Sequence, residues 1–151
     1  MKALYAHILL PTDGSSLATR GAKAGVLLAK ALGAKITLVF VGIPYPSAVY
    51  GDAEVYYAGP SPSEHKRFTE EAAQKAFASV VLAAKRAGVD FTTQLAVNSR
   101  PWQGILKTAR ARKCDAIVMA SHGRSGLAGL FLGSETQRVL AHSSIPVLVI
   151  R

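Results

Sequence analysis

Five short apolar runs, separated by segments with helical character, constrain the fold of this chain more than any other feature. The runs are residues 5–10, 36–41, 91–97, 115–120 and 145–150. Because they are nearly all apolar, they are typical of strands buried on both faces of a sheet. Strands that alternate with helices form a parallel sheet, and right-handed crossovers wind it in both directions. We therefore predict a Rossmann-like α/β fold with one doubly wound, five-stranded parallel sheet in the order 3-2-1-4-5.

Two of the intervening helices carry clear signals at their ends. A helix over residues 17–32 follows Ser15 or Ser16 as N-cap and stops before Gly33. A second helix begins with the capping box of residues 61–64, Ser-Pro-Ser-Glu, and runs to about residue 87, with Gly88 as its stop. We expect the first helix to turn one apolar face inward, made of Leu17, Ala24, Leu28 and Ala31.

The other two helices are shorter. Pro101 opens a basic helix that ends near Lys113 and carries Ile105 and Ala109 on its inward side. Residues 134–137, Ser-Glu-Thr-Gln, repeat the capping-box spacing, so the last helix is expected over about residues 134–142. The 151 residues thus form a single domain, interrupted at residues 42–60 by a long loop rich in proline, glycine and tyrosine. Its tyrosines suit a pocket cap, a subunit contact or plain surface packing.

Composition narrows the classes of protein. Half of the residues are hydrophobic and only 18% are charged, which excludes a disordered chain. No apolar run approaches the roughly 20 residues of a membrane span, and the N-terminus lacks a signal-peptide cleavage pattern. The single cysteine, Cys114, fits a reducing compartment, so we expect the cytoplasm. Although the formal net charge is +9, the basic residues are scattered and only Trp102 lies near the densest group. We therefore do not expect nucleic acid as the partner.

The segment from Cys114 to Arg138 contains the strongest candidate for a binding site. An apolar strand leads into a turn rich in glycine and serine, and Gly133 precedes the last helix. A strand that runs into a glycine loop and a helix N-terminus can hold a phosphate with backbone N–H groups. In the predicted strand order this loop and the turn at residues 11–13 meet at the carboxyl ends of strands one and four. This is the switch point, where the winding direction of the sheet reverses and where ligands bind in such folds. Asp13 is placed there to accept from a ribose hydroxyl, or only to complete a local turn.

Other chemistries find little support in the sequence. Neither the P-loop pattern nor the dinucleotide fingerprint is present. The four histidines show no metal-ligand spacing, no G-x-S-x-G elbow surrounds a serine, and Cys114 suits a buried apolar position. His122 can meet a phosphate or a base, or bond to its local backbone. Arg124 adds a charge-assisted donor, and Ser134 and Thr136 add hydroxyls beside the last helix. These residues favour a binding protein without catalytic residues over an enzyme.

Four stretches of the chain resemble the universal stress protein family. They read PTDGSS, DAIVMASHGRSG, LGSETQRVLAHS and PVLVIR, and together they extend the similarity over essentially the whole chain. The ATP-binding branch of that family carries the pattern G-x2-G-x9-G-[ST]. In this sequence the second glycine of the pattern is Gly123, the third is Gly133 and the hydroxyl residue is Ser134. Ala120 replaces the first glycine, a departure that can narrow the approach to ribose and phosphate.

The resemblance implies a stress sensor or regulator that binds ATP, with Mg²⁺ as an accompanying ion, and forms a homodimer through the final strand, Pro146 to Ile150. It also implies a set of nucleotide contacts. They are Pro11, Thr12 and Asp13 along adenine and ribose, Val41 and Met119 at the base, and Ala120, His122, Gly123, Arg124, Gly133, Ser134, Glu135 and Thr136 at ribose and phosphates. Two alternatives stay open: a slow ATP hydrolase, and a dimeric interaction module with a vestigial pocket and protein partners of its own.

Overall fold

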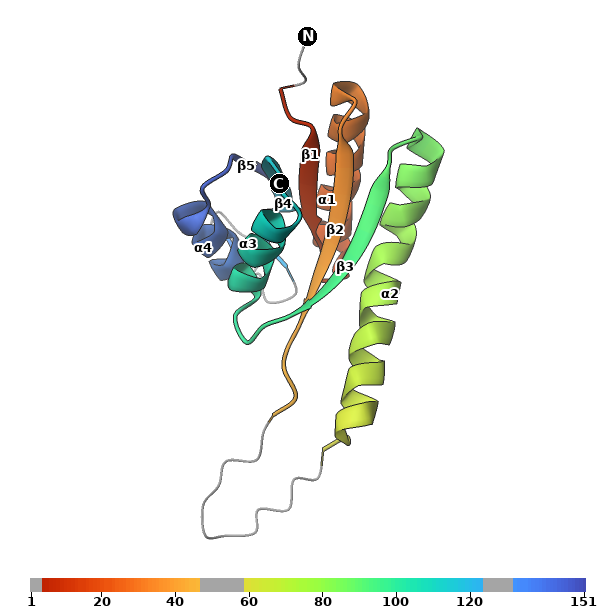
Figure 1. The fold of residues 1–151 in the computed structure, drawn as a ribbon, viewed down its shortest axis with the longest axis vertical. Helices are drawn as coiled ribbons and strands as arrows, with labels where there is room; N and C mark the ends of the chain where they lie inside the picture. Colours follow the sequence, from red (N-terminus) through yellow and green to blue (C-terminus); the bar gives the residue numbers. More distant parts are fainter. Residues whose placement is uncertain (1–3, 47–58, 124–131) are drawn as a thin grey trace.

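A computed structural model describes residues 4–46, 59–123 and 132–151. In these ranges the chain forms a parallel sheet in the order β3-β2-β1-β4-β5, which confirms the predicted fold (Figure 1). The strands are β1 (His7–Pro11), β2 (Lys35–Gly42), β3 (Phe91–Val97), β4 (Ala116–Ala120) and β5 (Val147–Ile150). The helices are α1 (Ser16–Leu32), α2 (Pro62–Ala87), α3 (Pro101–Ala111) and α4 (Ser134–His142). None of the described helices is long and apolar enough to cross a membrane.

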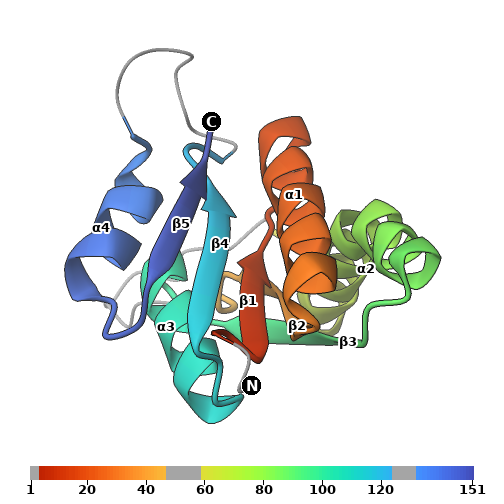
Figure 2. The ribbon, with the colours of Figure 1, turned by 90° about the horizontal axis from the view of Figure 1, so that it is seen from above.

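The helices cover the sheet in pairs, and each pair encloses its own core. Figure 2 shows α1 and α2 on one side of the strands and α3 and α4 on the other. Ile8, Leu10 and Val118 point into the core under α1 and α2. Leu9, Ile117 and Met119 alternate with them and point into the core under α3 and α4. This alternation along β1 and β4 explains why both strands are buried at every position and, apart from His7, are apolar.

The helix ends follow the sequence signals with one exception. The capping box of α2 is confirmed, since the Ser61 hydroxyl accepts from the Glu64 amide while the Glu64 carboxylate accepts from the Ser61 amide. Ser15 caps α1 by accepting from the Ala18 amide at 3.2 Å. The second predicted capping box is wrong, because Gly133 is the N-cap of α4 and no side chain caps that end. The Gly133 amide donates to the Ser121 carbonyl oxygen at 2.8 Å, which holds the N-cap in place, and the helix itself spans Ser134–His142 as predicted.

The inward face of α1 also differs from the predicted one. Its buried side chains are those of Ala18, Ala22, Val26 and Ala29, with Gly21 and Gly25 between them. These small residues bring α1 close to the sheet. A Cβ at Gly25 would lie 2.3 Å from Cδ2 of Leu10, and a Cβ at Gly21 would lie 3.0 Å from the Ala120 nitrogen. The helix therefore packs mainly through glycine and alanine. Of the predicted face, Leu17, Ala24 and Leu28 are only partly buried, with Leu28 at the margin of the core, and Ala31 is exposed.

The described start of the long loop is held against α2. The carbonyl oxygen of Ile43 lies 2.9 Å from Nε2 of His65, and the Tyr45 ring meets the same imidazole edge-on at a centroid distance of 5.5 Å. Tyr45 therefore packs against a helix. The other tyrosines of this loop, Tyr50, Tyr56 and Tyr57, lie outside the described residues.

Candidate nucleotide-binding crevice

The ends of β1 and β4 bring two loops of distant sequence into contact. The strands are neighbours in the sheet, with Ile8 opposite Ala116 and Leu9 opposite Ile117. Beyond their ends, a Cβ at Gly123 would lie 2.3 Å from Oδ2 of Asp13 and 3.3 Å from its Cγ. Only a glycine allows this approach, because a methyl group at position 123 would overlap the carboxylate. The turn after β1 and the loop after β4 therefore meet at the point where the winding direction of the sheet reverses.

The carboxylate of Asp13 is also part of a local turn. Its Oδ1 accepts from the Ser15 amide at 2.9 Å, and the Thr12 hydroxyl accepts from the Gly14 amide at 3.2 Å. Gly14 has a φ of 81°, the left-handed conformation that such a turn requires. The local role of Asp13 is therefore present, and it orients Oδ2 toward Gly123.

The loop after β4 is joined to the start of α4 by backbone hydrogen bonds. The Ser121 amide donates to the Ile150 carbonyl oxygen at 2.8 Å, which extends the pairing of β4 with β5. The Ser121 carbonyl oxygen accepts from Gly133, and the Ser121 hydroxyl lies 3.0 Å from Nδ1 of His122. Gly133 has a φ of −60°, so its conformation does not require glycine. Its Cβ would, however, lie 3.2 Å from the Ser121 oxygen, so the close approach favours glycine.

Thr136 and Ala120 hold α4 and α1 against the end of β4. The Thr136 hydroxyl, which is buried, donates to the Ala120 carbonyl oxygen at 3.0 Å. The methyl group of Ala120 faces α1, because a Cβ at Gly21 would lie 3.1 Å from it. Neither side chain is directed at the meeting point of the two loops. The departure from glycine at position 120 is thus accommodated by a glycine on the neighbouring helix.

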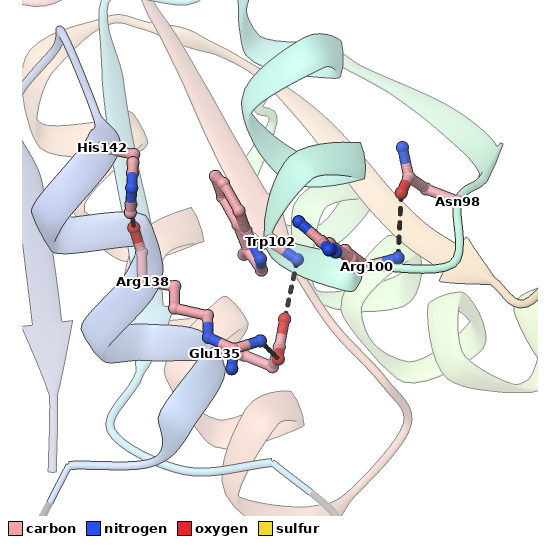
Figure 3. A network of polar contacts seen from close by, with 6 residues as sticks. All are labelled: Asn98, Arg100, Trp102, Glu135, Arg138 and His142. Atoms are coloured by element: carbon pink, nitrogen blue, oxygen red, sulfur yellow. Dashed lines mark hydrogen bonds and ion pairs between the residues drawn. The ribbon is translucent and has the colours of Figure 1, made fainter.

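Glu135 links α4 to α3 across the surface of the domain. Its Oε2 accepts from the Trp102 amide at 2.7 Å, and its Oε1 lies 3.7 Å from the Arg138 guanidinium (Figure 3). The N-cap of α3, Arg100, has no side-chain hydrogen bond, so Glu135 satisfies one of the free amides of that helix. The Trp102 ring lies 4.5 Å from the His142 ring between centroids. The sequence offered no signal for the two contacts of Trp102, because they join residues more than 30 positions apart.

Replacing Glu135 by alanine is expected to lower the free energy of unfolding by about 1 to 2 kcal/mol. The carboxylate accepts from a helix N-terminal amide, and losing such a cap costs about that much. Chemical denaturation of the variant and the parent measures the difference. Glu71→Ala is the matched control, because Glu71 forms only an exposed ion pair with Arg67 at 3.7 Å. Equal losses from the two variants would show that the contact with Trp102 contributes nothing.

The remaining predicted contacts divide between core and surface. Val41 and Met119 belong to the core under α3 and α4, and Pro11 and Thr12 are buried at the end of β1. Ser134 is exposed on the first turn of α4, and Arg124 lies outside the described residues. Burial raises the pKa of the Cys114 thiol to about 11, so it is protonated and unreactive at neutral pH. Within the described ranges, no three of the His, Cys, Asp and Glu side chains are grouped to hold a metal ion.

A doubly wound parallel sheet with two loops in contact at its switch point defines a class of α/β proteins that bind ligands at that edge. The sequence profile of the universal stress protein family matches residues 4–151, and the chain belongs to this family. A universal stress protein of Thermus aquaticus is 34% identical over 148 residues, which cover 98% of this chain and 100% of the relative.

Solved structures share the fold. That of MJ0577 from Methanocaldococcus jannaschii has a TM-score of 0.78 and 26% identity, and the match covers 97% of this chain and 96% of the other. A universal stress protein from Archaeoglobus fulgidus, solved in complex with dAMP, has a TM-score of 0.65 and 18% identity, with coverage of 99% and 100%.

Proposed function

We propose that this universal stress protein binds ATP, with Mg²⁺ as the accompanying ion, in the crevice between the end of β1 and the start of α4. The observation that carries the proposal is the contact between Asp13 and Gly123, which joins the two loops of the switch point. A second observation supports it: among the described residues no side chain caps the N-terminus of α4, the kind of helix end that can hold an anion with its amides. The related protein from Archaeoglobus fulgidus that was solved with dAMP supports an adenine nucleotide as the ligand class.

The described residues suggest how the ligand lies. Asp13 accepts from ribose hydroxyls, while the backbone of Gly123 and Gly133 and the Ser134 hydroxyl contact the phosphates. Thr12, Val41 and Met119 form the apolar wall on the side of the base. We assign Thr136 and Glu135 a positioning role instead, because their side chains already hold α4 against Ala120 and Trp102. No group in this set is placed to activate water, so we propose a cytoplasmic sensor or regulator that binds ATP without efficient hydrolysis.

Ala120→Gly is expected to leave the dissociation constant for ATP within about threefold of the parent value. The methyl group it removes faces Gly21 and not the crevice. The same change is expected to lower the free energy of unfolding by about 1 kcal/mol, because glycine is disfavoured inside a strand. Calorimetric titration and denaturation measure the two quantities separately. A large gain in ATP affinity would instead identify Ala120 as the cause of a vestigial pocket.

Titration of the purified, nucleotide-free protein with ATP and Mg²⁺ tests the proposal. We expect saturable heat with one nucleotide per chain, and ATP recovered intact after prolonged incubation. An absence of heat at millimolar ATP would favour the interaction module with a vestigial pocket. Phosphate release that Ser134→Ala abolishes would instead favour the slow hydrolase.

We further propose that two copies pair through the final strand, Pro146 to Ile150. β5 lies at an edge of the sheet, with β4 as its one neighbouring strand in the described part of the chain, and Leu148 is 48% exposed. A second copy of the same strand would cover this apolar edge. Analytical ultracentrifugation of the parent and Leu148→Glu tests the pairing, with a dimer expected for the parent and a monomer for the variant. A parent that sediments as a monomer at high concentration would contradict it.

A further inference from the structure

The opposite end of the sheet, where the strands begin, carries a second hollow that the proposed nucleotide site does not use. It has a volume of about 340 Å³. It is lined by residues from β1, β2, β3 and the end of α3: His7, Lys35, Ile36, Asp90, Phe91, Thr92, Ala111, Arg112 and Lys113. Three of these side chains are cationic at neutral pH and one is anionic, so the lining has an excess of positive charge.

The three cations of this hollow are only partly balanced by the nearby carboxylates, those of Asp90 in the lining and Asp115 beside His7. Lys35, Arg112 and Lys113 are exposed, and none forms an ion pair with a carboxylate in the described ranges. Arg112 donates to the Gln94 side-chain oxygen, which holds its guanidinium in place. Cations at the end of a helix also complement its dipole. That effect accounts for Arg112 and Lys113, but it does not account for Lys35, which lies on β2.

Two lining residues, His7 and Thr92, are joined by a chain of hydrogen bonds through Thr37, which is fully buried beneath the hollow. Nε2 of His7 lies 2.8 Å from the Thr37 hydroxyl, which lies 3.0 Å from the Thr92 hydroxyl. His7 is only 9% exposed, and burial, reinforced by the charge of Lys35, lowers its pKa. The facing charges are those of Lys35, Arg112 and Asp115; the Asp115 carboxylate accepts from the Ala6 and His7 amides at 2.8 and 3.0 Å. A neutral imidazole therefore lies beneath a cationic rim.

Lys113 has a backbone conformation that lysine rarely adopts. α1 and α2 both end at a left-handed glycine, Gly33 with a φ of 65° and Gly88 with a φ of 69°. After α3 the left-handed position is occupied by Lys113, with a φ of 55°. Two hydrogen bonds close the turn: the Lys113 amide donates to the Arg110 carbonyl oxygen at 3.0 Å, and the Cys114 amide donates to the Ala109 carbonyl oxygen at 2.8 Å. A left-handed residue other than glycine is disfavoured, and such residues occur preferentially where they serve a function. Here the unusual residue contributes a cation to the hollow.

We propose that this hollow is a binding site for a phosphate group, held by Lys35, Arg112 and Lys113 above the His7–Thr37–Thr92 chain. The positive excess fits a compact, multiply charged anion, and the rigid guanidinium suits its oxygen atoms. The hollow is too small to follow the backbone of a nucleic acid. The site is separate from the proposed nucleotide crevice, because parallel strands place their two ends on opposite edges of the sheet.

The histidine ring signals of the full chain provide a test by NMR. Inorganic phosphate, added at constant ionic strength, is expected to shift the ring signals of His7 with a midpoint in the low millimolar range. It is also expected to raise the pKa of His7, because a neighbouring anion favours the imidazolium. His122, at the nucleotide crevice, is the internal reference. A shift of His122 alone would place the anion in that crevice and overturn the proposal, as would an unchanged His7. Neither result depends on ATP binding.

Lys113→Gly separates binding from folding. Glycine is the preferred residue at the left-handed position, so the variant is expected to fold at least as stably as the parent in thermal denaturation. Its affinity for phosphate is expected to be about tenfold lower, since a charge-assisted hydrogen bond is lost. Lys107→Gln, which removes one charge from the exposed face of the same helix, is the matched control and should retain the parent affinity. If both variants lost phosphate affinity equally, phosphate would be attracted only by the net positive charge of the protein, and the proposed site would be contradicted.

A parallel titration with glucose 6-phosphate identifies the source of the phosphate group. A response to both compounds supports a site for phosphomonoesters, and a response to inorganic phosphate alone supports a site for the free ion. The absence of a His7 response to either compound contradicts the proposal.

Discussion

Gly21→Leu is expected to lower the free energy of unfolding by about 3 kcal/mol, the upper end of what overpacking costs. A Cβ at this position would already lie 3.0 Å from the Ala120 nitrogen and 3.1 Å from its Cα and Cβ. These are mostly backbone atoms of β4, which is paired with β1 on one side and β5 on the other. The strand cannot yield without losing hydrogen bonds, so α1 must move away from the sheet. Denaturant unfolding measures the loss.

The control for this prediction is Ala31→Leu on the same helix. Ala31 is exposed, and leucine is a strong helix former, so this variant should remain within about 0.5 kcal/mol of the parent. If both leucine variants had the same stability, the close contact between α1 and β4 would contribute nothing to the free energy of unfolding. The explanation of how Ala120 is tolerated would then fail as well.

Gly123→Val is expected to weaken ATP binding by about 100-fold, which corresponds to about 2.7 kcal/mol. A Cβ at position 123 would lie 2.3 Å from Oδ2 of Asp13, so the carboxylate must turn out of the position proposed for ribose. The valine side chain would also block the approach of phosphate to the backbone. Calorimetric titration with ATP and Mg²⁺ measures the loss.

The effect on folding should be small by comparison. The valine would meet the carboxylate of Asp13, whose side chain is only partly buried and can rotate. We therefore expect the melting temperature to change by only a few degrees. Ala31→Val, at an exposed site far along α1, should change neither quantity appreciably. If Gly123→Val bound ATP as tightly as the parent, the contact between the two loops would play no part in nucleotide binding, and the proposal would be contradicted.

The strands and most helix ends could be predicted because they depend on local signals, and the strand order follows from the rules for right-handed crossovers. Apolar runs, a capping box and glycines after helices act within a few residues of the sequence. The face of α1 could not be predicted in this way. The pattern pointed to the face of Leu17, Ala24, Leu28 and Ala31. The buried face is instead the one on which Gly21 and Gly25 let the helix approach Ala120 and Leu10. That choice depends on the sheet, which the local pattern does not contain.

In the candidate crevice, too, some features could be predicted from the sequence and others could not. The strand order alone was sufficient to predict that Asp13 and the glycine loop lie at one edge, and the contact with Gly123 agrees with this prediction. The roles of Glu135 and Thr136 depend on contacts made after folding, with Trp102 and with Ala120. The hollow at the other edge was also missed, because its cations come from β2 and from the turn after α3. In the sequence they read as scattered surface charge.

The central claim is that an adenine nucleotide occupies the crevice between the end of β1 and the start of α4. Backbone amide NMR of the uniformly labelled protein during titration with ATP and Mg²⁺ tests it most directly. We predict that the largest saturable shifts occur at Gly14, Gly123, Ser134 and Glu135, with little change at Lys35 and Lys113. Shifts confined to Lys35 and Lys113, or no saturable shift at millimolar ATP, would contradict the claim.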